Sequence, residues 1–358
     1  MSDSVLLKGR GATLNAPSAR FDDCERHTDG DWRDAEALID GAPPPPRTTV
    51  TIEHPRTIIT KNASPDVPFD RSINAYRGCE HGCIYCFARP SHAFHNLSPG
   101  LDFETRLFAK PTAPALLRAE LSRRGYQPAT IAMGTNTDPY QPIEDTHRIT
   151  RSLLEVFLEF HHPVSIVTKS DRVTRDLDLL SPLAARGLAH VGVSITTLDP
   201  ALARRLEPRA AAPRRRLAAV RALRDAGVPV AVLIAPIIPA INDHEIEALV
   251  EAAAEAGALG VYAIPVRLPH EVAPLFRDWL VTHYPDRAAH VMSLIRSIRD
   301  GRDNDPEFGS RMRGSGPFAD LIHARIAAAR RRYGVEGRLP PLTIARFRVP
   351  GPEQLALL

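Results

Sequence analysis

The 358-residue chain has only four cysteines and contains no long apolar run. Four cysteines are too few for the disulfide framework that stabilises many small secreted proteins. No stretch approaches the roughly 18 consecutive apolar residues of a transmembrane helix, and the first residues lack the apolar core of a signal peptide. We therefore expect a cytoplasmic protein without a membrane partner.

The chain also has little excess of positive over negative charge. The net charge is +3, which gives no general argument for a polyanionic partner. Arginine supplies 41 of the 45 basic residues, so a cluster of arginines carries less information here than in an average chain. The hydrophobic fraction of 44% is ordinary for a globular protein, and the composition says nothing about oligomeric state.

The chain divides into three parts. Residues 1–50 lack apolar periodicity and end in "GAPPPPR", which predicts a poorly ordered N-terminal extension that could be anchored by Phe21, Trp32, Leu38 and Ile39. Residues 70–270 alternate amphipathic helical patterns with six apolar runs, at 72–76, 129–134, 164–170, 189–197, 228–239 and 259–266. This alternation predicts an α/β fold, a partial (β/α)6 TIM-like barrel of parallel strands. Residues 271–358 are expected to form a C-terminal helical extension on the substrate side.

Three cysteines lie together in "YRGCEHGCIYCFARP" (76–90), directly after the first apolar run. Clustered thiolates bind zinc or iron–sulfur clusters. A structural zinc site needs a fourth protein ligand, for which the candidates are His81, His92, His95 and Cys24. A four-iron cluster held by three thiolates would instead leave one iron open to another molecule. The spacing alone leaves both interpretations open.

The CxxxCxxC spacing, with an aromatic residue before the last cysteine, resembles the signature of the radical S-adenosylmethionine (SAM) superfamily over residues 70–270. "NAYRGCEHGCIYCFAR", "LEPRAAAPRRRLAAV" and "PIIPAIND" resemble the branch related to spore photoproduct lyase, and within it an uncharacterised bacterial subfamily. The resemblance implies a [4Fe-4S] cluster on Cys79, Cys83 and Cys86, with SAM at the open iron. It further implies reductive cleavage of SAM to a 5′-deoxyadenosyl radical, and a flavodoxin- or ferredoxin-like electron donor.

The same resemblance places the SAM contacts on the loops that follow the strands. The family's Gly-Gly-Glu stretch is missing, so residues 135–138 would have to receive the methionine amino group. An arginine beyond the fourth strand, Arg209, would pair with the methionine carboxylate or form a helix-capping ion pair. The predicted cofactor-binding residues are Tyr85, Thr135, Asn136, Asp138, Lys169, Ser170, Ser194, Thr196, Arg209, Ile237 and Asn242.

The branch resemblance favours a nucleic acid or nucleotide as substrate. A protein or small-metabolite substrate stays open, as does a non-catalytic zinc module that binds nucleic acid. The lyase repairs a thymine dimer in DNA and returns a hydrogen atom from a cysteine, but no cysteine follows Cys86 here. Candidate catalytic residues are therefore Cys24, Tyr140 and Tyr262. The loop "GSRMRGSGP" (309–317) either binds phosphate through Arg311 and Arg313 or braces the barrel.

Overall fold

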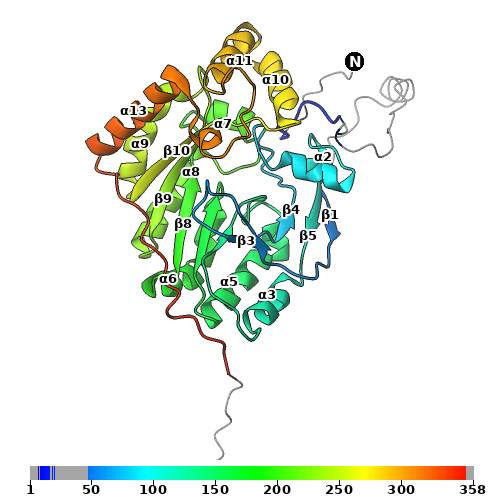
Figure 1. Ribbon diagram of the computed structural model, residues 1–358, viewed down its shortest axis with the longest axis vertical. Coiled ribbons are helices and arrows are strands. Elements are labelled where there is room, and N and C mark those ends of the chain that lie inside the picture. The colour runs from blue at the N-terminus through cyan, green and yellow to red at the C-terminus, as the bar shows by residue number, and fades with distance from the viewer. Residues whose placement is uncertain (1–6, 8, 17, 19, 21–46, 352–358) are drawn as a thin grey trace, which may run out of the picture.

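Six parallel strands form most of one sheet in the computed structural model, which describes residues 7, 9–16, 18, 20 and 47–351. The strands are β3 (Arg71–Ile73), β6 (Ile131–Met133), β7 (Val164–Thr168), β8 (Ala189–Ser194), β9 (Val230–Ile237) and β10 (Gly260–Pro265). They lie side by side in this order, and the short β2 (Thr60–Lys61) pairs antiparallel with β3. Within the described residues β10 does not pair with β3, so the barrel is open (Figure 1) and the predicted partial barrel is confirmed.

Helices follow the strands and pack against the sheet, as the alternating pattern predicts (Figure 1). The longer ones are α3 (Ala113–Leu121), α5 (Ile149–Glu159), α6 (Leu177–Ala185), α8 (Pro213–Asp225) and α9 (Ile246–Glu255). The short helices in the connections are η1 (Arg89–His95), α2 (Asp102–Thr105), α4 (Glu144–His147), η2 (Asp171–Asp176), α7 (Pro200–Leu206) and η3 (Asp243–Glu245). Gly227 follows α8 at φ +73°, a left-handed conformation that ends helices and favours glycine.

The predicted first strand (72–76) is divided between two sheets. Its beginning belongs to β3, whereas its end starts β4 (Tyr76–Arg77), which pairs with β5 (Arg106–Ala109) beside β1 (Thr49–Ile52). The division falls at Asn74, whose Oδ1 accepts from the Asn136 N–H at 3.0 Å and whose carbonyl accepts from Lys110 Nζ at 3.0 Å. These side-chain contacts replace sheet pairing and turn the chain out of the main sheet.

Part of the N-terminal extension docks on the body. The N–H groups of Gly11 and Ala12 donate to the carboxylate of buried Glu104 at 2.9 and 2.8 Å, and Thr13 Oγ1 donates to Asp278. The extension therefore has anchors among residues 11–13. The anchors expected from the sequence lie outside the described residues, as does Cys24, and the limits 1–50 remain a prediction.

Docking of this segment depends on Gly11. A Cβ built there would lie 1.7 Å from the carbonyl oxygen of Gly82. We expect Gly11→Ala to detach the segment, because one of the two backbones must move away. Trypsin should then cleave at Arg10 in the variant much faster than in the wild type. Gly351→Ala, which adds a Cβ in open space, is the control. Equal cleavage of wild type and Gly11→Ala would contradict the docking.

The residues after β10 form helices and then an extended segment. The helices are α10 (Val272–His283), η4 (Pro285–Arg287), α11 (Ala288–Ser297), α12 (Ser310–Arg313) and α13 (Gly316–Arg332), the last packing on α9 and β10. The extended segment crosses the amino ends of the strands, where the Thr343 N–H donates to the Gly187 carbonyl at 2.9 Å (Figure 1). No helix in the described part of the chain is long and apolar enough to cross a membrane. The domain limits 70–270 and 271–358 remain predictions.

Candidate active site

The cysteine loop, residues 78–88, connects β4 to η1 across the carboxyl ends of the parallel strands. The Gly78 carbonyl accepts from Thr137 Oγ1 at 2.6 Å and from Gln141 Nε2 at 3.2 Å, both of which follow β6. The Ile84 N–H donates to the Leu206 carbonyl at 3.1 Å, at the end of α7 beyond β8. The loop is therefore fixed to segments that follow two different strands, at the end of the barrel where catalysis is expected.

A buried ion pair supports the loop. Arg89, with no exposed surface, donates through Nε to the Cys83 carbonyl at 2.9 Å and through Nη2 to Glu104 Oε1 at 2.6 Å. Glu104 is the same carboxylate that receives Gly11 and Ala12. One carboxylate thus connects the N-terminal segment, through Arg89, to the backbone of the cysteine loop.

The three cysteines of the loop are free thiols, and Cys79 and Cys83 are each only 7% exposed. Burial raises the pKa of Cys79, Cys83 and Cys86, so without metal the thiols are protonated at neutral pH. Bound iron would displace these protons. No group of three His, Cys, Asp or Glu side chains among the described residues is arranged to hold a single metal ion. A cluster takes one thiolate per iron and does not require its ligands to meet at one point. The donor set therefore fits a cluster with one open iron.

Asp138 links the cysteine loop to the end of β7. Its carboxylate accepts from Thr168 Oγ1 at 2.6 Å and from the Lys169 N–H at 2.7 Å, and Oδ2 lies 3.3 Å from His81 Nδ1. Burial opposes ionisation, but the charge of His81 and the hydrogen bonds lower the pKa of Asp138 to about 2. Asp138 is therefore an anion whose contacts within the protein hold the loop and the strand end together.

Four side chains, Tyr85, Thr196, Glu207 and Arg216, form a buried group that we call the Glu207 cluster. Tyr85 Oη and Thr196 Oγ1 both donate to Glu207, the latter at 2.6 Å, and Arg216 forms an ion pair with it. Burial opposes ionisation, but Arg216 and Lys169 lower the pKa of Glu207 to about 2. The hydrogen bond from Tyr85 fixes the orientation of its ring.

Lys169 connects the Glu207 cluster to β8. Its Nζ donates to Ser194 Oγ at 2.7 Å and lies 5.8 Å from the centroid of the Tyr85 ring. The structure therefore brings together Tyr85, Lys169, Ser194 and Thr196, four of the predicted SAM contacts, from three separate segments. Whether they bind SAM remains a prediction.

Asn242 and Ile237 lie at the end of β9. Asn242 Nδ2 donates to the Thr196 carbonyl at 2.7 Å and to the Pro236 carbonyl at 3.0 Å, while its Oδ1 accepts from the Ile238 N–H at 2.6 Å. Ile237 is fully buried. The amide of Asn242 therefore fixes the ends of β8 and β9 relative to each other.

Three further predicted residues are engaged within the protein. Thr135 Oγ1 accepts from Asn74 Nδ2 at 3.1 Å, and the Asn136 backbone contacts the same asparagine, so both fix the end of β6 to the end of β3. Ser170 caps η2 by accepting from the Arg172 N–H at 3.2 Å. This contact makes Ser170 a helix cap.

Arg209 and the two candidate tyrosines lie apart from the Glu207 cluster. The Arg209 guanidinium pairs with Glu80 Oε1 at 3.0 Å, an ion pair with the cysteine loop and not with a helix end, and its contact with SAM stays a prediction. Tyr140 is fully buried in the main apolar core. Tyr262 lies in β10 against the C-terminal segment, where its Oη accepts from the Leu339 N–H at 3.4 Å. The third candidate, Cys24, lies outside the described residues.

The sequence analysis did not identify Arg216 or Arg89. Both are arginines in a chain rich in arginine, so their residue type gave no signal. Arg216 did have a positional signal, because it shares the buried face of α8 with Ala219, Val220 and Leu223. A charged residue on an apolar helical face indicates a buried partner.

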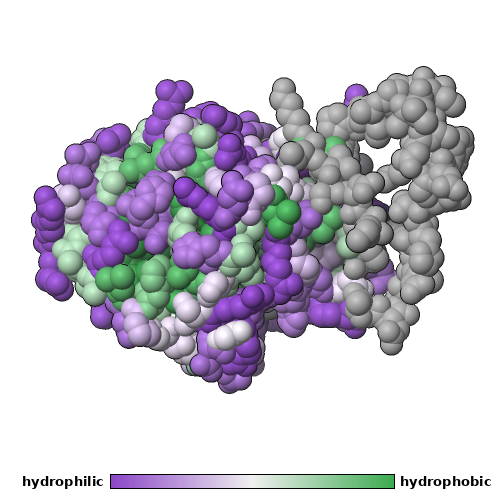
Figure 2. All heavy atoms as spheres, turned by 90° about the horizontal axis from the view of Figure 1, so that it is seen from above, coloured by the Kyte–Doolittle hydropathy of each residue, from purple (hydrophilic) through white to green (hydrophobic). Residues whose placement is uncertain are grey.

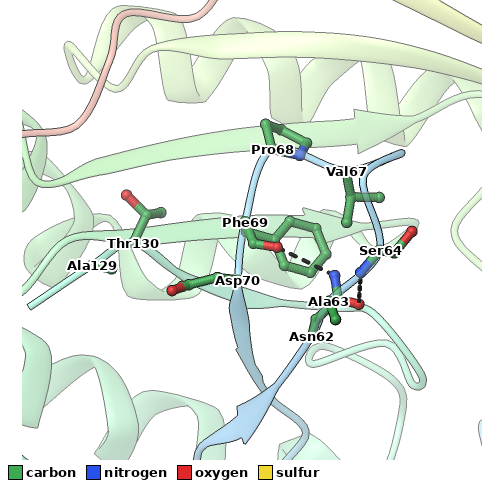
Figure 3. A pocket seen from close by; sticks show the side chains of 9 residues that line it. All are labelled: Asn62, Ala63, Ser64, Val67, Pro68, Phe69, Asp70, Ala129 and Thr130. Carbon is green, nitrogen blue, oxygen red and sulfur yellow. Dashed lines mark hydrogen bonds between the residues drawn. The ribbon is translucent and has the colours of Figure 1, made fainter.

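A cavity of about 480 Å³ lies away from the cysteines, beside the amino ends of β3 and β6 (Figure 3). Two of its polar groups serve the β2–β3 hairpin: Asn62 Nδ2 donates to the Phe69 carbonyl at 3.2 Å, and Asn62 Oδ1 accepts from the Ser64 N–H at 3.0 Å (Figure 3). These contacts fix the shape of the hairpin, so the cavity is not the candidate active site.

Arg311 braces the same hairpin. It forms an ion pair with Asp66, donates to Ser64 Oγ at 2.8 Å, and its neighbour Gly309 donates to Asp66 at 2.6 Å. We expect Arg311→Gln to lower the melting temperature, because Arg311 is paired with Asp66, and to bind a test oligonucleotide no more weakly than the wild type does. Arg313→Gln is the matched control, and both variants are compared by thermal melts and oligonucleotide titrations. Loss of nucleic-acid affinity in Arg311→Gln alone would contradict the brace.

The family model of the radical SAM superfamily matches residues 73–253, which include the cysteine loop and the strands from β6 to β9. The chain belongs to the radical SAM superfamily. It is therefore an enzyme of the SAM-dependent radical class, and the family implies both SAM and a [4Fe-4S] cluster.

Relatives and solved structures agree with this assignment. An uncharacterized protein of Mycobacterium tuberculosis is 36% identical over 232 residues, 64% of this chain and 68% of that protein. The radical SAM Nalpha-GlyT isomerase of Pseudomonas phage M6 is 23% identical over 225 residues, 62% of this chain and 45% of that protein. A mutant of spore photoproduct lyase has a similar fold, with a TM-score of 0.57 and 17% identity, covering 88% of this chain and 86% of that one. The branch predicted from the sequence is confirmed at the level of the fold.

Proposed function

We propose that the protein binds a [4Fe-4S] cluster through Cys79, Cys83 and Cys86 and uses it to cleave SAM reductively. The chemistry that the cluster and SAM supply when bound is a 5′-deoxyadenosyl radical that abstracts a hydrogen atom from the substrate. The observation that carries this proposal is the position of the three thiols. They lie on one loop at the carboxyl ends of the parallel strands, beside the Glu207 cluster.

The chain's own residues would bind and orient SAM. Three thiolates leave one iron open for the methionine end of SAM. Ser194 and Thr196 would offer hydroxyls to the ribose, and Tyr85, held by Glu207, would present its ring to the adenine. The burial of these side chains would exclude water from the radical. We include a flavodoxin- or ferredoxin-like electron donor in the proposal.

A nucleic acid or nucleotide is the substrate that we propose. Spore photoproduct lyase, whose fold is similar at 17% identity and a TM-score of 0.56, has been solved in complex with a dinucleoside spore photoproduct. This similarity supports the substrate class by analogy of fold. A protein or a small metabolite is the alternative.

Anaerobic purification tests the proposal. We expect a brown protein with about four irons and four sulfides per chain, which forms 5′-deoxyadenosine from SAM when dithionite is added. A colourless protein that contains zinc, and that produces no 5′-deoxyadenosine, would refute the radical chemistry and favour a zinc module instead.

A further inference from the structure

Phe87 is an exposed aromatic residue in a loop that is otherwise mostly buried. It directly follows Cys86 and is 52% exposed, whereas the neighbouring Tyr85 is 7% exposed. One exposed ring is ordinary on a protein surface. This ring matters here because the cation of Arg267 lies beside it.

Arg267 lies beside Phe87 and has no anionic partner. It follows the end of β10, and its guanidinium carbon lies 5.9 Å from the centroid of the Phe87 ring. Its Nε is buried without a hydrogen bond, and Nη1 donates to the sulfur of Met312 at 3.3 Å, a weak acceptor. In the part of the chain that the structure describes, no carboxylate forms an ion pair with Arg267. A guanidinium that is partly withdrawn from water and left unpaired is costly, so an external anion would satisfy it.

Two other arginines at this corner, Arg299 and Arg311, have their partners inside the protein. Arg299, fully buried, donates to the Pro265 carbonyl at 2.9 Å and to the Arg311 carbonyl at 2.7 Å. Arg311 in turn pairs with Asp66. The acids near Arg267 are Asp66 and Asp305, and nearby Arg311 adds positive charge. Arg267 is therefore available to an external anion, on the same side as the exposed ring. Figure 2, which looks down on the top of Figure 1, shows apolar side chains among polar ones on that face of the molecule.

We propose that Phe87 and Arg267 form a substrate platform, on which a nucleobase stacks against Phe87 while a phosphate of the same strand binds Arg267. The inference rests on the proposed function, because it names the nucleotide contact of that same active site. Stacking aromatics beside cations are the means by which proteins bind single-stranded nucleic acid. A guanidinium also matches phosphate oxygens bidentately. An acidic peptide would satisfy Arg267 but would leave the ring of Phe87 without a planar partner.

The position of the platform suits the chemistry. Phe87 is the next residue after Cys86, so a base stacked on it lies beside the cluster-binding loop. Arg267 reaches the same place from the segment that follows β10. A strand bound to both residues would therefore lie beside the cluster-binding loop.

The test uses the anaerobic, cluster-loaded protein and a fluorescein-labelled single-stranded oligodeoxynucleotide of about ten residues. Fluorescence anisotropy should show that Phe87→Leu and Arg267→Gln each weaken binding about tenfold. Arg267→Gln should also reduce the salt slope by about one counterion. Phe87→Trp should restore affinity and Arg267→Lys should restore the salt slope. Matched controls, expected to bind like wild type, are Phe94→Leu and Arg124→Gln, both at exposed positions.

A separate measurement distinguishes this inference from the proposed function. The formation of 5′-deoxyadenosine by the wild type without oligonucleotide tests the proposed function alone, and its absence would refute the radical chemistry itself. If the wild-type protein cleaves SAM but does not bind the oligonucleotide, the platform is overturned. The platform is also overturned if Phe87→Leu and Arg267→Gln both bind the oligonucleotide as tightly as the wild type does. A third outcome is that only Arg267→Gln weakens oligonucleotide binding and that an acidic peptide competes with the oligonucleotide. This outcome would overturn the proposal of a nucleotide and indicate a peptide substrate.

Discussion

Alanine at Cys79, Cys83 or Cys86 should remove the iron from the protein and abolish the reductive cleavage of SAM. Each thiolate would hold one iron, so the loss of any one exposes a second iron to solvent and makes the cluster unstable. The polypeptide should still fold, because Arg89 and Glu104 hold the backbone of the cysteine loop independently of the thiols. Iron and sulfide should fall from about four per chain to a trace, and 5′-deoxyadenosine below detection, with an unchanged circular dichroism spectrum.

Cys24→Ala is the matched control for these variants. It removes the remaining thiol of the chain, which lies outside the cysteine loop. Iron, sulfide and cleavage of SAM should stay at the wild-type level. If Cys24→Ala lost as much iron as Cys83→Ala, four cysteines would ligate the cluster, and the open iron that binds SAM would no longer be available.

The six parallel strands could be predicted because their signal is local. Apart from β3, each is a short and largely apolar run that is followed by a helix. The small sheet of β1, β4 and β5 could not be predicted in this way. β4 has two residues, and β1 is largely exposed, so neither shows an apolar run. Their pairing depends on Asn74 and Lys110, which act only once the two sheets are in place.

The candidate site divides along the same line, into residues with a local signal and residues without one. The cysteines were predicted from their spacing, and Ser194 and Thr196 from their place at the end of a strand, both of which are properties of the sequence. The ion pairs Arg89–Glu104 and Arg216–Glu207 join residues that come together only in the folded protein. Asn242 was predicted as a cofactor contact from its type and position, and this stays a prediction. Its amide also joins the ends of two strands, a contact that has no local signal in the sequence.

Glu207→Gln should cause a large loss of stability. Glu207 and Arg216 are each 1% exposed at the side chain, and the substitution leaves the guanidinium buried without its anion. Breaking a buried pair by removing one partner costs about 3–5 kcal/mol. Equilibrium denaturation in urea should show this as a lower midpoint with an unchanged m-value. The double variant Glu207→Gln, Arg216→Met should recover much of the loss, because no buried charge remains unpaired.

Acid unfolding distinguishes this electrostatic cause from a packing defect. The pKa of Glu207 is about 2 in the folded protein against an ordinary value of 4.5, so its stabilising effect is complete above pH 4.5 and is lost as the pH falls toward 2. Wild-type stability should therefore decline through this window, and Glu207→Gln should show a shallower decline, because glutamine does not titrate. The two proteins should converge in stability near pH 2, since protonated Glu207 leaves Arg216 as unpaired as glutamine does. A difference between them that stayed constant from pH 6 to pH 2 would contradict the ion pair as the source of the stability. The contribution of Glu207 to the stability of the protein would then come from its shape and from its hydrogen bonds with Tyr85 and Thr196, which glutamine only partly reproduces.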